Sequence, residues 1–350
     1  MLTEREKVGD IEMNLREHPV KPFSPDGEKD LDTLLNEMEN ISFQGRNLGI
    51  CFRVWKEMLK DRVFIFLGLA GAMVPAGMRK VVSFLITHRL IDCIVSTGAN
   101  LFHDCHESLG RKHYKASPFL EDVKLRKMEM DRIYDTLASE EEFQLTDQFI
   151  QNFAGTLDAT RSYTTREFLY LLGEFLSKKA KEEGILTSAY KNKVPIYCPA
   201  IGDSSIGIAL VAGKVNVNFD FLRDVEETAY LVKEAGKTAV IYIGGGTPKN
   251  FIQQTQVTLN VSGIKSEGHY YAIQIITDPP HWGGLSGATL EESQSWGKIS
   301  PQAKKVTLYC DATLALPLLT EALARELKRG LTRVFVPKLN PGKSKIEILK

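Results

Sequence analysis

The sequence is poor in cysteine. Only five cysteines occur in 350 residues, and no two of them are spaced as a CxxC pair. Because their number is odd and their positions are scattered, a disulfide framework is not expected. The simplest environment for such a chain is the reducing cytoplasm.

Net charge and long apolar runs are also missing. The chain carries 44 Lys and Arg against 44 Asp and Glu, so it has no general attraction to nucleic acid or to an anionic membrane. The longest apolar stretch, residues 63–78, is shorter than a membrane span and is interrupted by glycines and a proline. The charged amino terminus lacks the apolar segment of a signal peptide. We therefore expect a cytoplasmic protein with neither nucleic-acid nor membrane partners.

The sequence does contain an alternation of strand and helix patterns. Short apolar runs predict buried strands at residues 63–67, 91–96, 194–198, 238–243, 270–277 and 306–310. Helix patterns occur at residues 75–88, 164–184, 221–235 and 313–328. Ser139 and Thr164 each precede a glutamate at the spacing of a capping box. This alternation predicts an α/β fold with a doubly wound, mostly parallel sheet and helices on both faces.

The chain shows no internal boundary. No repeat of fixed period and no interior linker rich in Pro, Gly or Ser is present. Residues 1–44 are polar at first and rich in proline, which predicts an N-terminal extension. We expect a single domain over residues 45–335 and a C-terminal tail over residues 336–350.

Small and acidic residues follow nearly every predicted strand. They include Thr97-Gly98-Ala99-Asn100, Asp203, Gly244-Gly245-Gly246, Thr277-Asp278 and Asp311-Ala312. Ligands bind beyond the carboxyl ends of parallel strands, where small residues admit a cofactor, helix N-termini bind phosphate and aspartates accept from ribose hydroxyls. No GxGxxG motif is present, so each loop is weak evidence by itself. Together they favour a nucleotide site.

Two further segments contain reactive side chains. His103 and His106 have a spacing that could place both rings on one helix face, but no third or fourth ligand lies nearby, so we expect no metal site. Residues 278–298 form a Gly- and Pro-rich segment that holds two of the three tryptophans and ends at Lys298. A lysine partly desolvated by Trp296 could act as a nucleophilic amine. From the residues alone, a surface lysine beside a packed tryptophan is the simpler interpretation.

A resemblance to a known family favours the nucleophilic interpretation of Lys298. From about residue 45 to residue 325 the chain resembles the deoxyhypusine synthase family, and in particular its bacterial deoxyhypusine synthase-like branch. The matching residues are Phe66-Leu67-Gly68, the loop after Ile91, Pro199-Ala200 with Asp203 and Ser205, the three glycines, Ser295-Trp296-Gly297-Lys298, and Tyr309 with Asp311-Ala312. The resemblance implies a Rossmann-like core, NAD as cofactor, and a homotetramer with active sites at subunit interfaces.

The resemblance also implies roles for single residues. Lys298 matches the nucleophile that holds an aminobutyl group as an imine. The matching substrate-pocket positions are Glu292, Trp296, Asn250, Gly283, Ser286 and His103. The matching cofactor positions are Thr97, Gly98, Ala99, Asp203, Gly245, Thr277, Asp278, Asp311 and Ala312.

Several positions depart from the family pattern. Phe102 and His103 stand where the family has two glutamates, Ile208 and Leu285 replace aspartates, and Asn250 replaces a histidine. Each lost carboxylate removes a charge-assisted partner for an ammonium group. We therefore expect a kept lysine and cofactor site with a rebuilt amine pocket, and a protein acceptor is doubtful.

The expected function is an NAD-dependent transferase that moves an aminobutyl-type group from an amine donor to an amine acceptor through a Lys298 imine. The alternatives are an NAD-dependent amine dehydrogenase, a homospermidine synthase-type enzyme, and a non-catalytic NAD-binding protein.

Overall fold

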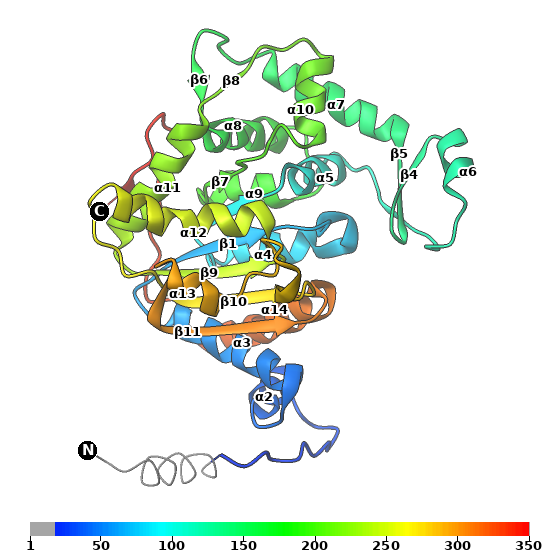
Figure 1. The fold of residues 1–350 in the computed structure, drawn as a ribbon. Coiled ribbons are helices and arrows are strands. Elements are labelled where there is room, and N and C mark those ends of the chain that lie inside the picture. Colours follow the sequence, from blue (N-terminus) through cyan, green and yellow to red (C-terminus); the bar gives the residue numbers. More distant parts are fainter. Residues whose placement is uncertain (1–17, 350) are drawn as a thin grey trace.

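A six-stranded parallel sheet forms the centre of the protein. The computed structural model describes residues 18–349 (Figure 1). The strands are β1 (Phe64–Leu69), β2 (Cys93–Ser96), β7 (Ile196–Tyr197), β9 (Thr238–Ile243), β10 (His269–Ile276) and β11 (Ile299–Tyr309). Their order is β11-β10-β9-β1-β2-β7, and every neighbouring pair is parallel. The predicted α/β class is confirmed.

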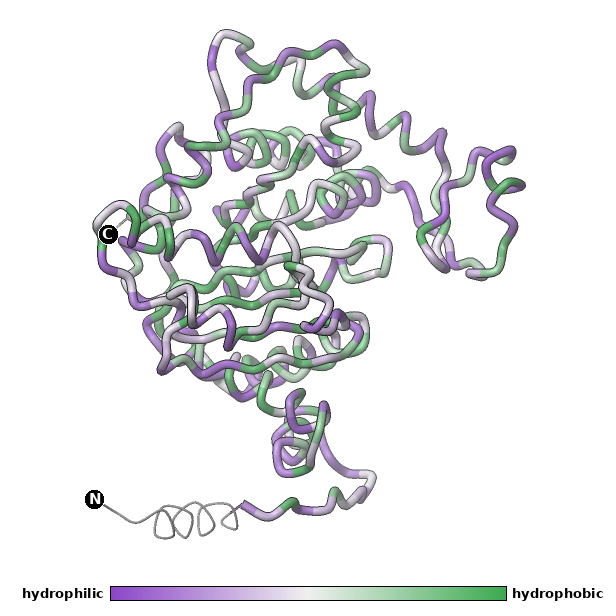
Figure 2. The backbone as a smooth tube through the Cα atoms, viewed as in Figure 1, coloured by the Kyte–Doolittle hydropathy of each residue, from purple (hydrophilic) through white to green (hydrophobic). Residues whose placement is uncertain are grey.

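Helices cover both faces of this sheet, because its strands are apolar on both sides. On one face, Ile65 and Leu67 belong to a core shared with α3 (Phe43–Leu59), α4 (Arg79–Thr87) and α14 (Ala312–Lys328). On the other, Phe64 and Phe66 pack with α11 (Phe221–Ala235), α12 (Gly246–Val261) and α13 (Leu290–Ser295). The strands accordingly form a hydrophobic centre in Figure 2.

The remaining helices surround this three-layered body. They are α2 (Leu31–Met38), α5 (Gly98–Ser108), α7 (Glu140–Ala154), α8 (Thr165–Ser177), α9 (Ile185–Asn192) and α10 (Ser205–Ala212). The predicted caps are confirmed: the Ser139 hydroxyl accepts from the backbone N–H of Glu142, and Thr164 forms a full capping box with Glu167. The predicted helix 164–184 is too long. Its C-terminal part is not helical, and α9 begins after Gly184 with its first N–H groups donating to the buried carboxylate of Asp104.

Other boundaries differ by a few residues. A π-helical turn, Val74–Met78, precedes α4, and Gly77 within it has a φ of 85°. β11 begins at Ile299, well before the predicted residue 306. It is an edge strand of the sheet, and its polar first half contains an irregularity, because pairing with β10 passes from Ile299 directly to Lys304. The part of the predicted N-terminal extension that covers residues 1–17 lies outside the described residues.

One segment projects away from the body. Residues 111–139, which we name the arm, contain β3 (Tyr114–Lys115), α6 (Asp122–Lys127), β4 (Met130–Ile133) and β5 (Thr136–Ser139). The three strands form a small antiparallel sheet in the order β3-β5-β4. Figure 1 shows this sheet and α6 standing clear of the helical layers.

Two further pairs of short strands complete the fold. They are β6 (Ser162–Tyr163) with β8 (Asn218–Phe219), and β12 (Lys338–Leu339) with β13 (Ile348–Leu349) in the tail. Within residues 18–349, no helix has the length and apolarity that crossing a membrane requires.

Candidate active site

The sheet has a topological switch point between β1 and β9. From β1 the chain adds β2 and β7 on one side and then returns to add β9, β10 and β11 on the other. Ligands bind at such a reversal, beyond the carboxyl ends of the strands. A cleft of about 330 Å³ lies there. Six predicted cofactor residues line it: Thr97, Gly245, Thr277, Asp278, Asp311 and Ala312.

The triple glycine is required at the centre of this cleft. Gly244 has a φ of 73°, and a Cβ on it would lie 3.3 Å from the Cβ of Ala70. A Cβ on Gly245 would lie only 2.6 Å from the Cα of Ser286. The glycines therefore let three chain segments approach closely, and they place the N-terminus of α12 at the cleft, where phosphate groups bind.

Asn100, one of the residues that follow the predicted strand 91–96, fixes one wall of the cleft, a role that the sequence did not assign to it. Its side chain is fully buried; Oδ1 accepts from the Val74 N–H at 3.2 Å, and Nδ2 donates to the Gly71 carbonyl at 2.8 Å and to Thr97 Oγ1 at 3.1 Å. Gly71 and Thr97 both line the cleft. Asn100 thus ties the loop after β1, which has no polar side chain of its own, to the start of α5.

Asp311 stands at the opposite wall. Its carboxylate caps α14 by accepting from the backbone N–H and the hydroxyl of Thr313, each at 2.7 Å. These hydrogen bonds lower the pKa of Asp311. A charged acceptor therefore remains at the end of β11 across the neutral pH range.

Lys298 lies outside this cleft, in the turn between α13 and β11. Its backbone is fixed on both sides, because its N–H donates to the Ser293 carbonyl and its carbonyl accepts from the His269 N–H, each at 3.0 Å. The turn needs Gly297, which has a φ of 68°. The side chain is half-buried, with Nζ 5.2 Å from the Trp296 ring centre and 3.5 Å from Asn250 Oδ1.

Burial lowers the pKa of Lys298, and the carboxylate of Glu292 opposes this effect. Glu292 lies in the first turn of α13, where the Thr289 hydroxyl accepts from its backbone N–H. The structure therefore brings together four of the predicted residues: Lys298, Glu292, Trp296 and Asn250. A lysine with a depressed pKa has a larger share of neutral, nucleophilic amine.

Lys249 connects Lys298 and its neighbours to the cleft, and no sequence pattern pointed to it. The residue is almost fully buried in the first turn of α12, where Nζ donates to Gln274 Oε1 at 3.0 Å and to the Ala288 carbonyl. Burial and the nearby Lys298 lower its pKa to about 8, against the effect of Glu292. Gln274 in turn donates to the carbonyls of Gly244 and Ser286. The loop that carries Ser286 is thereby held against the cleft.

The remaining predicted residues lie outside both the cleft and the group formed by Lys298, Glu292, Trp296 and Asn250. Gly98 and Ala99 are in the first turn of α5, and Gly98 packs so tightly on Ser204 that a Cβ would meet its Oγ at 2.3 Å. Asp203 is exposed in the same loop as Ser204 and does not line the cleft. Gly283 is exposed and has a φ of 71°.

His103 belongs to a separate cluster of histidines. Its Nδ1 lies 3.0 Å from Nε2 of His113, and His113 Nδ1 donates to the carboxylate of Glu107 at 2.7 Å. His106 and Phe143 pack against the same rings. Burial and the neighbouring histidines lower the pKa of His103 to about 3. Among residues 18–349, no group of three His, Cys, Asp or Glu side chains could hold a metal ion.

The residues that depart from the family pattern have different environments. Phe102 is buried in the core against Phe143, whereas Ile208 and Leu285 are exposed on the surface. Asp104, a possible substitute carboxylate, is fully buried at the start of α9, where burial raises its pKa to about 6. Asp104 is therefore occupied by a structural role and is not available to bind an amine.

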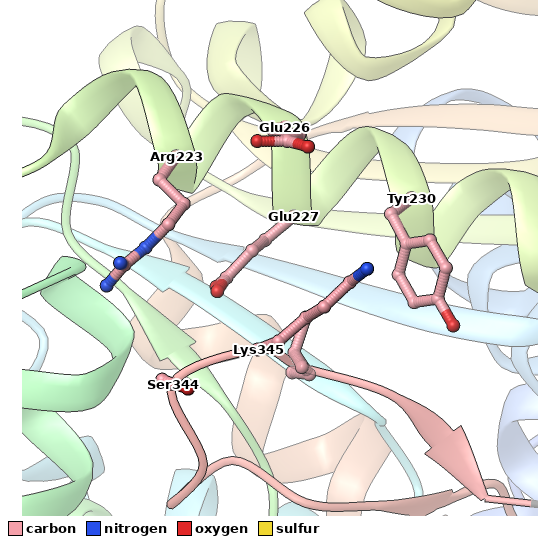
Figure 3. Close-up of a pocket in the computed structure, with 7 residues that line it drawn as sticks. Arg223, Glu226, Glu227, Tyr230, Ser344 and Lys345 are labelled. Atoms are coloured by element: carbon pink, nitrogen blue, oxygen red, sulfur yellow. The ribbon is translucent and has the colours of Figure 1, made fainter.

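A second cavity, of about 360 Å³, lies between α11 and the tail (Figure 3). Arg223, Glu226 and Tyr230 of α11 face Ser344 and Lys345 across it. Glu227 of α11 also lines the cavity, and its carboxylate pairs with the buried Arg166. None of the predicted site residues lines this cavity, so the cleft at the switch point is the candidate site.

Comparison with known proteins identifies relatives along most of the chain. The family model described as deoxyhypusine synthase matches residues 33–323. The chain is 49% identical over 309 residues to "Probable deoxyhypusine synthase 2" of Methanosarcina acetivorans, covering 86% of this chain and 89% of the relative. It is 39% identical over 299 residues to "Deoxyhypusine synthase-like protein" of Coxiella burnetii, covering 83% and 84%.

Similar folds are found among solved structures. A crystal structure from Entamoeba histolytica, assigned as a deoxyhypusine synthase, aligns with a TM-score of 0.58 and 18% identity over 87% of this chain and 96% of that chain. At this identity the match supports the fold alone.

Proposed function

The chain belongs to the deoxyhypusine synthase family of transferases, and we propose that it is an NAD-dependent enzyme that transfers an aminobutyl-type group between amines through an imine on Lys298. One observation supports this proposal above the others. Lys298 is the half-buried amine with a lowered pKa that lies among Glu292, Trp296 and Asn250.

The cleft at the switch point fits a dinucleotide. Gly244, Gly245 and Gly246 line it without side chains, the N-terminus of α12 suits a pyrophosphate, and Asp278 and Asp311 can accept from ribose hydroxyls. NAD, when bound, would accept a hydride from the donor amine and later return it to the product.

The protein's own residues supply the transfer step. Oxidation of a secondary amine gives a carbon–nitrogen double bond, and the neutral Nζ of Lys298 adds to its carbon. Expulsion of the departing primary amine leaves the aminobutyl carbon doubly bonded to Nζ. An acceptor amine then adds to the same carbon and releases Lys298. Asn250 Oδ1 accepts from Nζ, which orients the nucleophile, and the Glu292 carboxylate balances positive charge on the amines.

The acceptor is an amine, and the names of the relatives do not favour a free amine over a protein lysine. A free amine and a protein lysine should therefore both be tested as acceptors. The family also implies a homotetramer, which we include in the proposal.

Borohydride trapping tests the chemistry. Wild-type protein is incubated with NAD and a panel of amines, reduced, and digested for mass spectrometry of the Lys298 peptide. We expect a stable adduct on that peptide, and no adduct in Lys298→Arg, which keeps the charge but is a poor nucleophile. NADH release without any adduct would instead indicate an amine dehydrogenase. NAD binding with neither product would indicate a non-catalytic protein.

A further inference from the structure

Lys249 is a buried cation that the proposed chemistry does not use. Its side chain is 1% exposed, although a lysine is almost never fully buried unless it is paired. Within residues 18–349, the acceptors of its ammonium group are Gln274 Oε1 at 3.0 Å and the carbonyls of Ala288 and Ser286, the latter at 3.5 Å. These oxygens are all neutral, so no hydrogen-bonded partner cancels the positive charge of Lys249.

The three acceptors favour the charged form of Lys249. An ammonium group has three hydrogens to donate, and each of the three oxygens can accept one of them. Burial acts in the opposite direction and lowers the pKa of Lys249 to about 8. The side chain therefore carries its proton at neutral pH, in an interior where charges act on one another more strongly than in water.

This charge lies next to the proposed nucleophile. Lys249 directly precedes Asn250 in the first turn of α12, and Asn250 Oδ1 accepts from Nζ of Lys298. The charge of Lys298 lowers the pKa of Lys249, whereas the Glu292 carboxylate raises the pKa of both lysines. Repulsion between two like charges is reciprocal, so a charged Lys249 also disfavours the charged form of Lys298.

The neighbouring titratable groups on α13, β10 and β11 do not change this balance. Glu291, which precedes Glu292 on α13, pairs with Lys305 of β11 at 3.5 Å. His269 of β10, whose backbone N–H holds the Lys298 carbonyl, has its pKa lowered by burial to about 3 and is uncharged at neutral pH. The two lysines thus share the carboxylate of Glu292, which cannot neutralise both.

We propose that Lys249 is a positioning residue for the transfer reaction: its fixed positive charge keeps a share of Lys298 in the neutral, nucleophilic form. A second cationic group beside a reactive lysine activates the amine in this way. Lys249 is enclosed and held by three oxygens, so it acts through Lys298 and does not contact the substrate. The inference rests on the proposed function, because it assigns a second lysine to the same reaction.

Competitive acetylation of the full chain at pH 7 tests the proposal. Acetic anhydride reacts with neutral amines, so mass spectrometry of the Lys298 peptide measures the neutral fraction of that lysine, with the exposed Lys60 as internal standard. Lys249→Gln keeps a hydrogen-bond donor but removes the charge, and Lys249→Arg is the matched control that keeps the charge. We expect acetylation of Lys298 to be up to about tenfold slower in Lys249→Gln, which corresponds to a pKa raised by about one unit. In Lys249→Arg the rate should stay close to that of the wild type.

A wild-type rate in Lys249→Gln, or equal slowing in both variants, would overturn the proposal, because the effect would then not follow the charge. Gln274→Glu covers the case in which a variant at position 249 does not fold. Its carboxylate neutralises the ammonium in place, so slower acetylation of Lys298 supports the proposal and an unchanged rate contradicts it.

The acetylation assay contains neither NAD nor a donor amine, so its outcome is separate from that of the trapping experiment. A Lys298 that forms no imine but keeps this charge dependence would refute the proposed function alone. A Lys298 that forms the imine without the charge dependence would refute the role of Lys249 alone.

Discussion

The Nζ atom of Lys298 lies 3.5 Å from Oδ1 of Asn250, which joins the turn before β11 to the first turn of α12. A neutral amide at this position accepts from the amine without fixing its proton by charge. The reactivity of Lys298 therefore depends on the side chain at position 250.

Asn250→Asp is expected to raise the pKa of Lys298, because a carboxylate so close favours the ammonium form. The pH at which imine formation reaches half its maximum should move upward by about one unit. Borohydride trapping between pH 7 and 10 measures this shift. Gln254→Glu, one turn further along α12, makes the same change in charge and should leave the profile in place; equal shifts in both variants would contradict a local effect.

Asn100→Ala should weaken dinucleotide binding and should leave Lys298 and its neighbours unchanged. The substitution leaves the Val74 N–H and the Gly71 carbonyl without their buried partner, which costs about 1–3 kcal/mol. We expect roughly a tenfold loss of NAD affinity by calorimetry. Asn100→Asp keeps the acceptor for Val74 but cannot donate to Gly71, so an affinity close to that of Asn100→Ala would assign the effect to the Gly71 contact.

Two buried histidines should each make a contribution to stability that is lost on acidification. Burial lowers the pKa of His106 from 6.5 to about 4 and that of His269 from 6.5 to about 3. Between these values and pH 6.5 the unfolded chain binds more protons than the folded one. The contribution of these two histidines to the free energy of unfolding is therefore fully present above pH 6.5, and below it that contribution decreases by up to about 1.4 kcal/mol per pH unit and histidine.

Urea unfolding of wild type and His269→Gln at pH 7 and pH 5 measures this contribution. The glutamine can still accept from the Thr238 hydroxyl but cannot titrate. The loss of stability between the two pH values should be smaller in the variant. An equal loss in both proteins would show that His269 does not contribute.

The tail should contribute to stability through its buried side chains. Ile346 is 1% exposed and packs beneath α11, and the guanidinium of Arg166 donates to the carbonyls of Pro341 and Lys343. Ile346→Ala should lower the free energy of unfolding by about 2–5 kcal/mol. Its exposed neighbour Lys345 provides the control, since Lys345→Ala should change that free energy by less than about 0.5 kcal/mol. A small effect of Ile346→Ala would indicate that the tail is only loosely attached.

The central strands could be read from the sequence because they are buried on both faces. The six residues of β9 and the fifteen of α11 match the predicted ranges. α12 was not predicted, since its sequence GTPKNFIQQTQVTLNV is mostly polar and rich in residues with low helix propensity. That helix forms because Ile252 and Leu259 pack against the sheet, which is a tertiary effect.

The strand-end residues of the cleft could also be predicted, since the carboxyl ends of parallel strands meet at one edge. Lys249 could not, because a lone lysine carries no pattern, and Asn100 followed a predicted strand but had no predicted role. Their importance comes from burial and from partners distant in the sequence, such as Gln274 for Lys249 and Gly71 for Asn100.

By itself the sequence determined the α/β class and the triple glycine at the switch point, and it pointed to Lys298 as the proposed nucleophile, since strand burial, backbone freedom and a family motif are all local properties. The resemblance implied the side chains around that lysine, and only the tertiary structure shows how they reach it. Asn250 and Glu292 come from different helices and meet Lys298 through packing on the sheet. The tertiary structure also separated His103 from the cleft and left the arm uncovered, because these outcomes depend on where helices dock and not on the residues alone.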